Sequence, residues 1–147
     1  MFESMHVRKL LISELDWAND RYAEIDFVTS TESDLIAVAE VNGTKAGLGR
    51  ISAVSQNIGE LGGIVVLPAF RGLSLAKHVI NYLLEQSESA TLFCIPFAHL
   101  TDLYQSFGFQ PVRLTTPVPD RVAEKFQWCQ AHYDSPVILL SRYHSNI

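Results

Sequence analysis

The sequence predicts a mixed α/β domain, antiparallel in its first half, with a crossover helix between two parallel strands. Three observations predict it. Apolar residues recur at strand spacing in some segments and at helix spacing in others, an Asn42-Gly43 pair stands between two strand candidates, and an amphipathic segment links two short apolar runs. The chain has 147 residues without a repeat or linker, so a single domain over residues 1–147 is expected.

The first part of the chain predicts one helix and three strands. Residues 6–12 are a strand candidate, and residues 13–27 follow as an amphipathic helix with apolar residues every three to four positions. Residues 35–41 and 44–54 are strand candidates on either side of the Asn-Gly turn, which is typical of a two-residue hairpin.

A strand, a crossover helix and a second strand are predicted in the middle of the chain. Residues 60–67 (ELGGIVVL) are apolar and β-branched, as in a central strand, and Pro68 stops them. Residues 73–86 have apolar and polar side chains on opposite faces of a helix. Residues 91–95 (TLFCI) are again apolar. A helix between two such runs favours parallel pairing of the strands.

Two helices and two strands complete the predicted order. Residues 99–107 are a short helix that Gly108 ends, and residues 109–113 are a strand candidate. Residues 118–133 begin with first-turn helix chemistry, and residues 137–143 (VILLSRY) close the sheet.

Composition and charge exclude several classes of protein. Apolar residues make up 48% of the chain and charged residues 18%, which supports a buried core rather than disorder. A net charge of -5 with 11 Lys and Arg argues against nucleic acid as a partner, because phosphates need a basic face. No stretch approaches the roughly 20 apolar residues of a membrane span, so no membrane partner and a cytoplasmic location are expected. Cys94 and Cys129 fit no metal-site spacing, so no metal is expected and both thiols are taken as reduced.

The strand, turn and helix start in residues 60–76 carry the candidate chemistry. A helix that begins directly after a buried strand presents free amides and the positive end of its dipole, which suits an anion. Gly72, Ser74 and Ala76 are small enough to let a phosphate approach the backbone. An ordinary strand-to-helix connection explains the pattern equally well. The segment matches neither G-x-G-x-x-G nor a P-loop.

Two motifs in the correct order resemble those of the GNAT superfamily of acetyl-CoA-dependent N-acetyltransferases. Residues 66–76 (VLPAFRGLSLA) resemble its acetyl-CoA-binding motif, a V-x-P-x-[YF]-R-G lead-in followed by small residues. Residues 103–109 (LYQSFGF) resemble the second signature, L-Y-x-x-[LF]-G-F. The resemblance covers roughly residues 35–112. It implies one domain with a mixed, mostly antiparallel central sheet and helices on both faces.

The resemblance implies acetyl-CoA as co-substrate and a site on the central strand and the following helix. A bulge at Gly62 and Gly63 would free backbone groups of the strand for the pantetheine arm, and the amides after the strand would hold the pyrophosphate. The residues assigned to the cofactor in this way are Ile64, Val65, Val66, Arg71, Gly72, Leu73, Ser74, Leu75, Ala76 and Lys77.

Two positions depart from the family pattern. Ser74 replaces the middle glycine of the motif; its β-carbon narrows the cradle, while its hydroxyl could cap the helix or donate to a phosphate. Phe97 stands where the family often has an asparagine. The second departure puts one cofactor contact in doubt and leaves the rest of the site in place.

Acetyl transfer to an amine needs a base for the amine and an acid for the leaving thiolate. Tyr104 is the acid candidate by motif position, against the alternative of a half-buried aromatic that only packs. Glu60 is the base candidate, against a solvated carboxylate at a strand end. His99 is a second base candidate, and a carboxylate acting through water is a third. His132, Tyr133 and Trp128 are expected to pack rather than to line an acceptor pocket.

The function predicted from the resemblance is direct acetyl transfer from acetyl-CoA to an amine in a ternary complex. The acceptor is a small-molecule, peptide or protein amine, and the negative charge of the chain mildly favours a cationic one. The alternative is a non-catalytic module of the same fold that binds or senses acyl-CoA. The acyl chain, the oligomeric state (with a homodimer as one option) and the role of residues 113–136 stay open.

Overall fold

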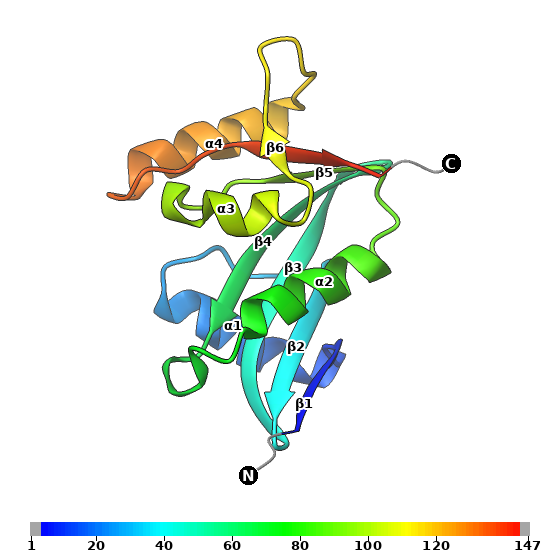
Figure 1. The fold of residues 1–147 in the computed structure, drawn as a ribbon, viewed down its shortest axis with the longest axis vertical. Coiled ribbons are helices and arrows are strands. Elements are labelled where there is room, and N and C mark those ends of the chain that lie inside the picture. Colours follow the sequence, from blue (N-terminus) through cyan, green and yellow to red (C-terminus); the bar gives the residue numbers. More distant parts are fainter. Residues whose placement is uncertain (1–3, 145–147) are drawn as a thin grey trace. The chain divides into compact units, whose positions relative to one another are not determined.

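The computed structural model describes residues 4–144, and its strands form a seven-stranded sheet in the order β1-β2-β3-β4-β5-β7-β6 within that range (Figure 1). The strands are β1 (Met5–Lys9), β2 (Leu35–Val41), β3 (Thr44–Ser55), β4 (Ile58–Val66), β5 (Thr91–Cys94), β6 (Gln110–Pro111) and β7 (Leu140–Tyr143). The α-helices are α1 (Leu15–Glu24), α2 (Leu75–Gln86), α3 (Thr101–Gln105) and α4 (Asp120–His132). None of these helices is both long and apolar enough to cross a membrane.

The predicted order of strands and helices is confirmed, and the differences lie at the ends of elements. The first strand stops at Lys9, and a 3-10 turn over Ile12–Glu14 precedes α1. Residues 56–57 form a tight turn in which Asn57 has φ +65°, so β4 begins earlier than its apolar run suggested. Asparagine tolerates this left-handed conformation better than most residues do.

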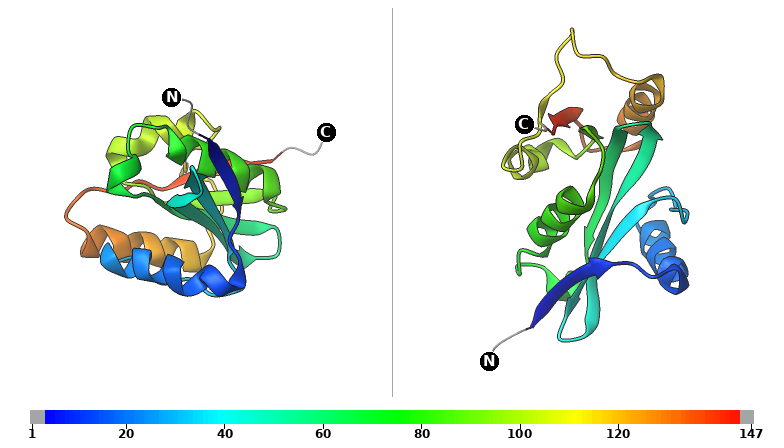
Figure 2. Two further views of the ribbon diagram at one scale, coloured as in Figure 1. Left: turned by 90° about the horizontal axis from the view of Figure 1, so that it is seen from below. Right: turned by 90° about the vertical axis from the view of Figure 1, so that its right-hand side faces the viewer.

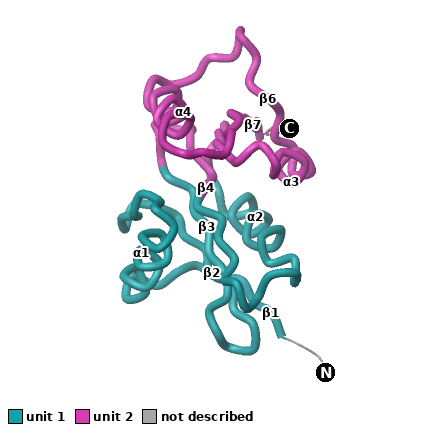
Figure 3. The backbone as a smooth tube through the Cα atoms, turned by 90° about the vertical axis from the view of Figure 1, so that its left-hand side faces the viewer, with its two compact units in different colours: residues 1–52, 63–87 teal, residues 53–62, 88–147 magenta. Residues whose placement is uncertain are grey.

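The chain folds into two compact units, shown in different colours in Figure 3. Unit 1 comprises residues 1–52 and 63–87, and unit 2 comprises residues 53–62 and 88–147. Strands β3 and β4 contribute to both units, because each unit boundary within the sheet falls inside one of them.

Unit 1 places α1 and α2 on opposite faces of its antiparallel strands (Figure 2). Ala18 and Tyr22 of α1 pack with Leu48 of β3 in one apolar cluster. The adjacent Gly49 faces α2, because a β-carbon there would lie 2.7 Å from Val79. Neighbouring residues of a strand point to opposite faces, so each helix covers one side.

Unit 2 contains the parallel pairing that the crossover helix predicted. Ile58–Leu61 of β4 pairs in parallel with Thr91–Cys94 of β5, and β7 pairs antiparallel with β5 and with β6. Helices α3 and α4 lie on opposite sides of β5 and β7 (Figure 2). Cys94 and Cys129 are both buried free thiols.

Helix α2 begins at a residue with left-handed backbone. Ser74 has φ +60° and ψ +26°, and its side chain makes no capping hydrogen bond. Of the two roles considered for this hydroxyl, capping the helix is therefore excluded, and donation to a phosphate stays a prediction. A capping serine normally has extended backbone, which aims its oxygen at the first-turn amides, and the left-handed conformation does not provide that geometry.

Replacing Ser74 by glycine is expected to stabilise the fold. Left-handed backbone costs a residue with a β-carbon about 1–2 kcal/mol, and glycine removes this cost. Glycine also makes the unfolded chain more flexible, which destabilises the folded protein by about 0.5–1 kcal/mol and offsets part of the gain. Urea denaturation should show Ser74→Gly to be more stable by roughly 0.5–1 kcal/mol. Ser87→Gly is the matched control, since Ser87 has φ -70° and gains nothing from glycine. Equal destabilisation of both variants would contradict the assigned strain.

Candidate functional site

Residues 71–77 form a turn of free amides at the start of α2. None of the amides of residues 72–77 donates a hydrogen bond to another described residue. The first backbone bond of this helix comes from His78, whose amide lies 3.4 Å from the Ser74 carbonyl. Unpaired amides at the positive end of a twelve-residue helix form a site for an anion.

The same turn is open and lined by positive charge. Gly72 has φ +87°, and a β-carbon there would meet nothing within 4 Å. Glycine is therefore needed at position 72 for its positive φ, and not because a side chain would lack room. Arg71 and Lys77, at the two ends of the turn, are both exposed. Free amides, an open approach and two exposed cations fit a polyphosphate group such as that of CoA.

The regular extended backbone of β4 is interrupted at Gly63. Gly63 has φ +59°, and its carbonyl accepts a hydrogen bond from the Tyr22 hydroxyl at 2.9 Å. A β-carbon on Gly63 would lie 2.8 Å from that hydroxyl oxygen, so the position requires glycine for its space as well as its φ. A glycine with positive φ occurs in one type of β-bulge, so this conformation is compatible with the bulge expected at Gly62 and Gly63.

Residues 64–66 follow the interruption and are half-buried. The Ile64 side chain faces α2 beside Gly49, while Val65 packs against the cluster of α1 and β2. Among the described residues, the pairs between β4 and β5 end at Leu61, and β4 continues through Val66. The side chains of Ile64 and Val65 are thus used for packing, and beyond Leu61 the backbone of β4 makes no pair with β5 among the described residues.

Tyr104 combines a buried ring with an open hydroxyl. The residue is 5% exposed, and its ring packs edge-on against Phe109. Its hydroxyl makes no hydrogen bond to a described residue. Every fully buried side-chain oxygen or nitrogen of the described residues has a hydrogen-bond partner, so an oxygen without one is not fully buried. The hydroxyl therefore reaches solvent. Burial, helped by the nearby Cys94 thiol, raises the pKa of Tyr104 and keeps it protonated.

Glu60 is held in an ion pair with Lys125 of α4. Lys125 Nζ lies 2.5 Å from Glu60 Oε2, and the Glu60 side chain is 11% exposed. Oε1 makes no hydrogen bond to a described residue and by the same argument is open to solvent. Glu60 is thus not the freely solvated carboxylate of the alternative interpretation. Glu60 and Tyr104 both interact electrostatically with the buried Cys94 thiol of unit 2.

The remaining candidates of unit 2 form an aromatic cluster. His99 is exposed and stacks on Phe97, whose ring meets Tyr133 edge-on. Trp128 is 44% exposed and stacks on His132 at 4.2 Å. These contacts agree with the packing role expected for His132, Tyr133 and Trp128.

Two residues near the predicted site were missed from the sequence. Lys125 gave no signal, because its partner Glu60 lies 65 residues away. Arg50 could have been found from the sequence, since it is the only charged residue in residues 46–51 of β3, all of which are buried. Arg50 is 7% exposed, and its guanidinium lies 4.1 Å from the centre of the Tyr22 ring.

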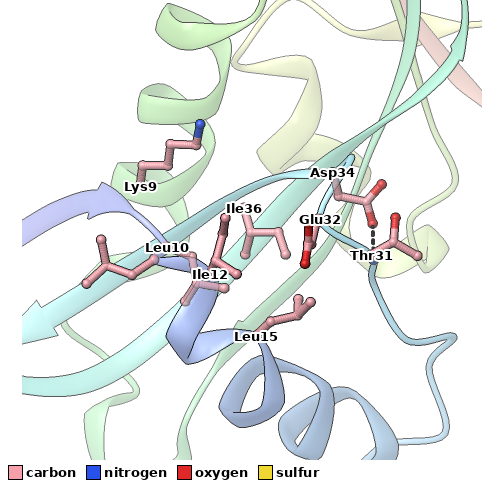
Figure 4. Close-up of a pocket in the computed structure, with 9 residues that line it drawn as sticks. Lys9, Leu10, Ile12, Leu15, Thr31, Glu32, Asp34 and Ile36 are labelled. Carbon is pink, nitrogen blue, oxygen red and sulfur yellow. Dashed lines mark hydrogen bonds between the residues drawn. The ribbon is translucent and has the colours of Figure 1, made fainter.

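A surface pocket of unit 1 lies apart from these residues. Leu10, Ile12, Leu15 and Ile36 form its apolar wall, and Glu32 and Asp34 add carboxylates (Figure 4). It shares no residue with the turn before α2. No role in the candidate site is assigned to it.

The comparisons with known proteins agree with the fold of the chain. The model of the acetyltransferase (GNAT) family matches residues 5–109. A crystal structure of Rv2747 from Mycobacterium tuberculosis, in complex with CoA and NLQ, has a TM-score of 0.74 and 16% identity, and the match covers 95% of this chain and 99% of that one. Among curated protein sequences, none matches significantly.

Two further structures show the same fold. N-acetylglutamate synthase from Neisseria gonorrhoeae, complexed with coenzyme A and N-acetyl-glutamate, has a TM-score of 0.67 and 12% identity over 99% of this chain and 36% of that one. The ribosomal-protein-S18-alanine N-acetyltransferase from Escherichia coli has a TM-score of 0.66 and 19% identity over 98% and 99%. The match of the family model over residues 5–109, more than half of this chain, shows that the chain belongs to the acetyltransferase (GNAT) family.

Proposed function

We propose that this chain is an acetyl-CoA-dependent N-acetyltransferase that transfers an acetyl group directly to an amine in a ternary complex. The unpaired amides of residues 72–77 carry the proposal, because nothing in the described part of the fold accepts their hydrogen bonds. Membership of the acetyltransferase family supports it. Several structures with the same fold were solved with CoA, which supports CoA as the ligand class.

Each part of acetyl-CoA has residues in unit 1 that suit it. The turn of free amides, with Arg71 and Lys77 at its ends, would hold the pyrophosphate. The backbone of residues 64–66 would pair with the pantetheine arm. The residues of this turn proposed to contact the cofactor are Arg71, Gly72, Leu73, Ser74, Leu75, Ala76 and Lys77. Bound in this way, acetyl-CoA supplies an activated acetyl group.

Two residues of unit 2 are proposed to move protons. Tyr104 would donate its proton to the departing thiolate, since its hydroxyl is open and stays protonated. Glu60 would accept the amine proton through Oε1, directly or by way of water, while Lys125 holds Oε2. The acceptor is an amine, and two of the similar structures carry names of enzymes that acetylate an amino group.

A non-catalytic acyl-CoA-binding module remains the alternative. Phe97 in place of the family's frequent asparagine and Ser74 in place of the motif's middle glycine favour it. Thiol release from acetyl-CoA with a broad panel of amines, beside calorimetric binding of acetyl-CoA, separates the two functions. Tight binding with no turnover on any amine would support the module.

The first test of the cofactor site is Ser74→Trp. The indole would fill the turn, and binding of acetyl-CoA should be abolished in calorimetry. Ser74→Gly is the matched variant and should leave the affinity within about 1 kcal/mol, because it restores a small residue with freer backbone. Circular dichroism establishes that the Trp variant is folded. Normal binding by a folded Ser74→Trp protein would place the site elsewhere.

The second test is Tyr104→Phe. A positioned acid contributes roughly 10²-fold to the rate, so kcat should fall tenfold or more while acetyl-CoA affinity stays unchanged. Stability should change by less than about 0.5 kcal/mol, since the hydroxyl makes no hydrogen bond within the described chain. The raised pKa means that the donor form persists as pH rises. Wild-type turnover should therefore show no loss from Tyr104 ionisation below about pH 10. Full activity of the Phe variant would remove this assignment.

The third test compares Glu60→Gln with His99→Ala and Lys125→Met. If Oε1 of Glu60 accepts the proton, only the Gln variant should lose most of its kcat, with acetyl-CoA binding intact. Lys125→Met breaks the same ion pair and keeps the carboxylate, so it controls for the structural effect. Equal loss of kcat in the Glu60 and Lys125 variants would assign the pair a structural role. An unaffected pH–rate profile in all three would exclude both Glu60 and His99 as the base.

A further inference from the structure

Arg50 is a buried cation that makes no ion pair with a described residue. The residue is 7% exposed, and no carboxylate of the described residues lies within 4.0 Å of its nitrogens. Arginine stays protonated in proteins, and burying its charge without an anion is unfavourable. Its contacts are the Tyr22 ring and one hydrogen bond, from Nη1 to Ser30 Oγ at 2.6 Å.

The guanidinium is held in one orientation. Ser30 is fixed by Asn19, whose side chain accepts from the Ser30 amide at 2.7 Å and donates to its carbonyl at 3.0 Å. The Tyr22 ring lies against the guanidinium and is itself tied to Gly63. Arg50 is therefore positioned by two neighbours that are each held by a second contact.

One edge of the guanidinium is unused and accessible. Nε and Nη2 make no hydrogen bond to a described residue. Every fully buried side-chain nitrogen of the described residues has a hydrogen-bond partner, so these two are not fully buried. These two nitrogens therefore touch solvent-accessible space. Nε and Nη2 form the pair of parallel donors that binds both oxygens of a carboxylate.

The open edge lies beside the interruption of β4. Nε is 3.0 Å from the position that a β-carbon on Gly63 would occupy. Gly63 immediately precedes residues 64–66, where the proposed function places the pantetheine arm and hence the acetyl end. Asp34 influences Tyr22 electrostatically, but it accepts a hydrogen bond from Thr31 and makes no ion pair with Arg50.

We propose that Arg50 binds a carboxylate of the acceptor, so that the acceptor is an amine with a carboxylate close to its amino group, as in an α-amino acid. This inference rests on the proposed function. The local cation offsets the net charge of -5, which would otherwise disfavour an anionic group. The apolar cluster around Tyr22 strengthens the interaction by lowering the local dielectric.

Matched acceptors test the inference in the wild-type protein. Each α-amino acid of a panel is compared with its amide and with the amine that lacks the carboxylate. The acid should have a kcat/KM about 10²-fold above its amide, because the amide leaves the guanidinium without an anion. Equal rates for acids and amides would overturn the inference and leave the proposed function standing. Failure to bind acetyl-CoA would overturn both.

Variants of Arg50 supply a second readout that needs no turnover. Calorimetry in the presence of CoA, which cannot transfer an acetyl group, should show amino-acid binding weakened about 10²-fold in Arg50→Gln. Arg50→Lys keeps the positive charge but loses the paired donors of the guanidinium, and should weaken amino-acid binding less than Arg50→Gln does. Arg121→Gln, at an exposed arginine of α4, is the matched control.

Folding is measured for each variant by its melting temperature. If Arg50→Gln does not fold, Arg50→Lys and the wild-type comparison decide the question. An Arg50→Lys or Arg50→Gln protein that melts at a lower temperature but binds amino acids as the wild type does would show that Arg50 only supports the strand.

Discussion

The left-handed backbone of Gly63 is stabilised by Tyr22, whose hydroxyl donates to the Gly63 carbonyl at 2.9 Å. No other residue type fits, because a β-carbon would collide with the same tyrosine and glycine alone adopts this φ without cost. Tyr22 is fully buried in α1, so the packing of that helix and the course of β4 depend on one another. The interruption sets how residues 64–66 leave the strand, with Ile64 toward α2 and Val65 toward α1. The course of residues 64–66, where the pantetheine arm is proposed to bind, therefore depends on one tyrosine–glycine contact.

The acidic composition of the chain and a polyanionic ligand are compatible because the relevant interactions are short-ranged. At physiological ionic strength, exposed charges more than about 8 Å apart are largely screened. Within that distance the free amides of residues 72–77 and the end of the α2 dipole act directly on a phosphate. Arg71 and Lys77 add charge at the same place. A net charge of -5 thus bears on approach from solution and not on the affinity of the turn itself.

Local patterns predicted most of the fold and located the candidate site in the strand and turn before α2. The Asn42-Gly43 turn, the order of elements and the parallel pair of β4 and β5 follow from residues close together in sequence. The conformation of Ser74 did not, because serine is rarely left-handed and its usual role at a helix start is to cap. Contacts between distant residues were also outside the reach of those patterns. The Tyr22–Gly63 hydrogen bond joins residues 41 apart, and the Glu60–Lys125 pair joins residues 65 apart. Such partners are decided by how strands and helices pack, which periodicity does not specify.

The polar atoms that the described part of the fold leaves unpaired bear on the choice between the proposed enzyme and a binding module. Folded proteins pair nearly all their buried polar groups, so half-buried atoms left open are informative. A module that only binds acyl-CoA needs the free amides before α2 and the other groups proposed to contact the cofactor, but no group that moves a proton. This chain also leaves open the hydroxyl of a buried tyrosine, Tyr104, and one oxygen of a carboxylate, Glu60, whose other oxygen is held by Lys125. One of these groups can donate a proton and the other can accept one. Those are the two proton transfers that acetyl transfer to an amine requires.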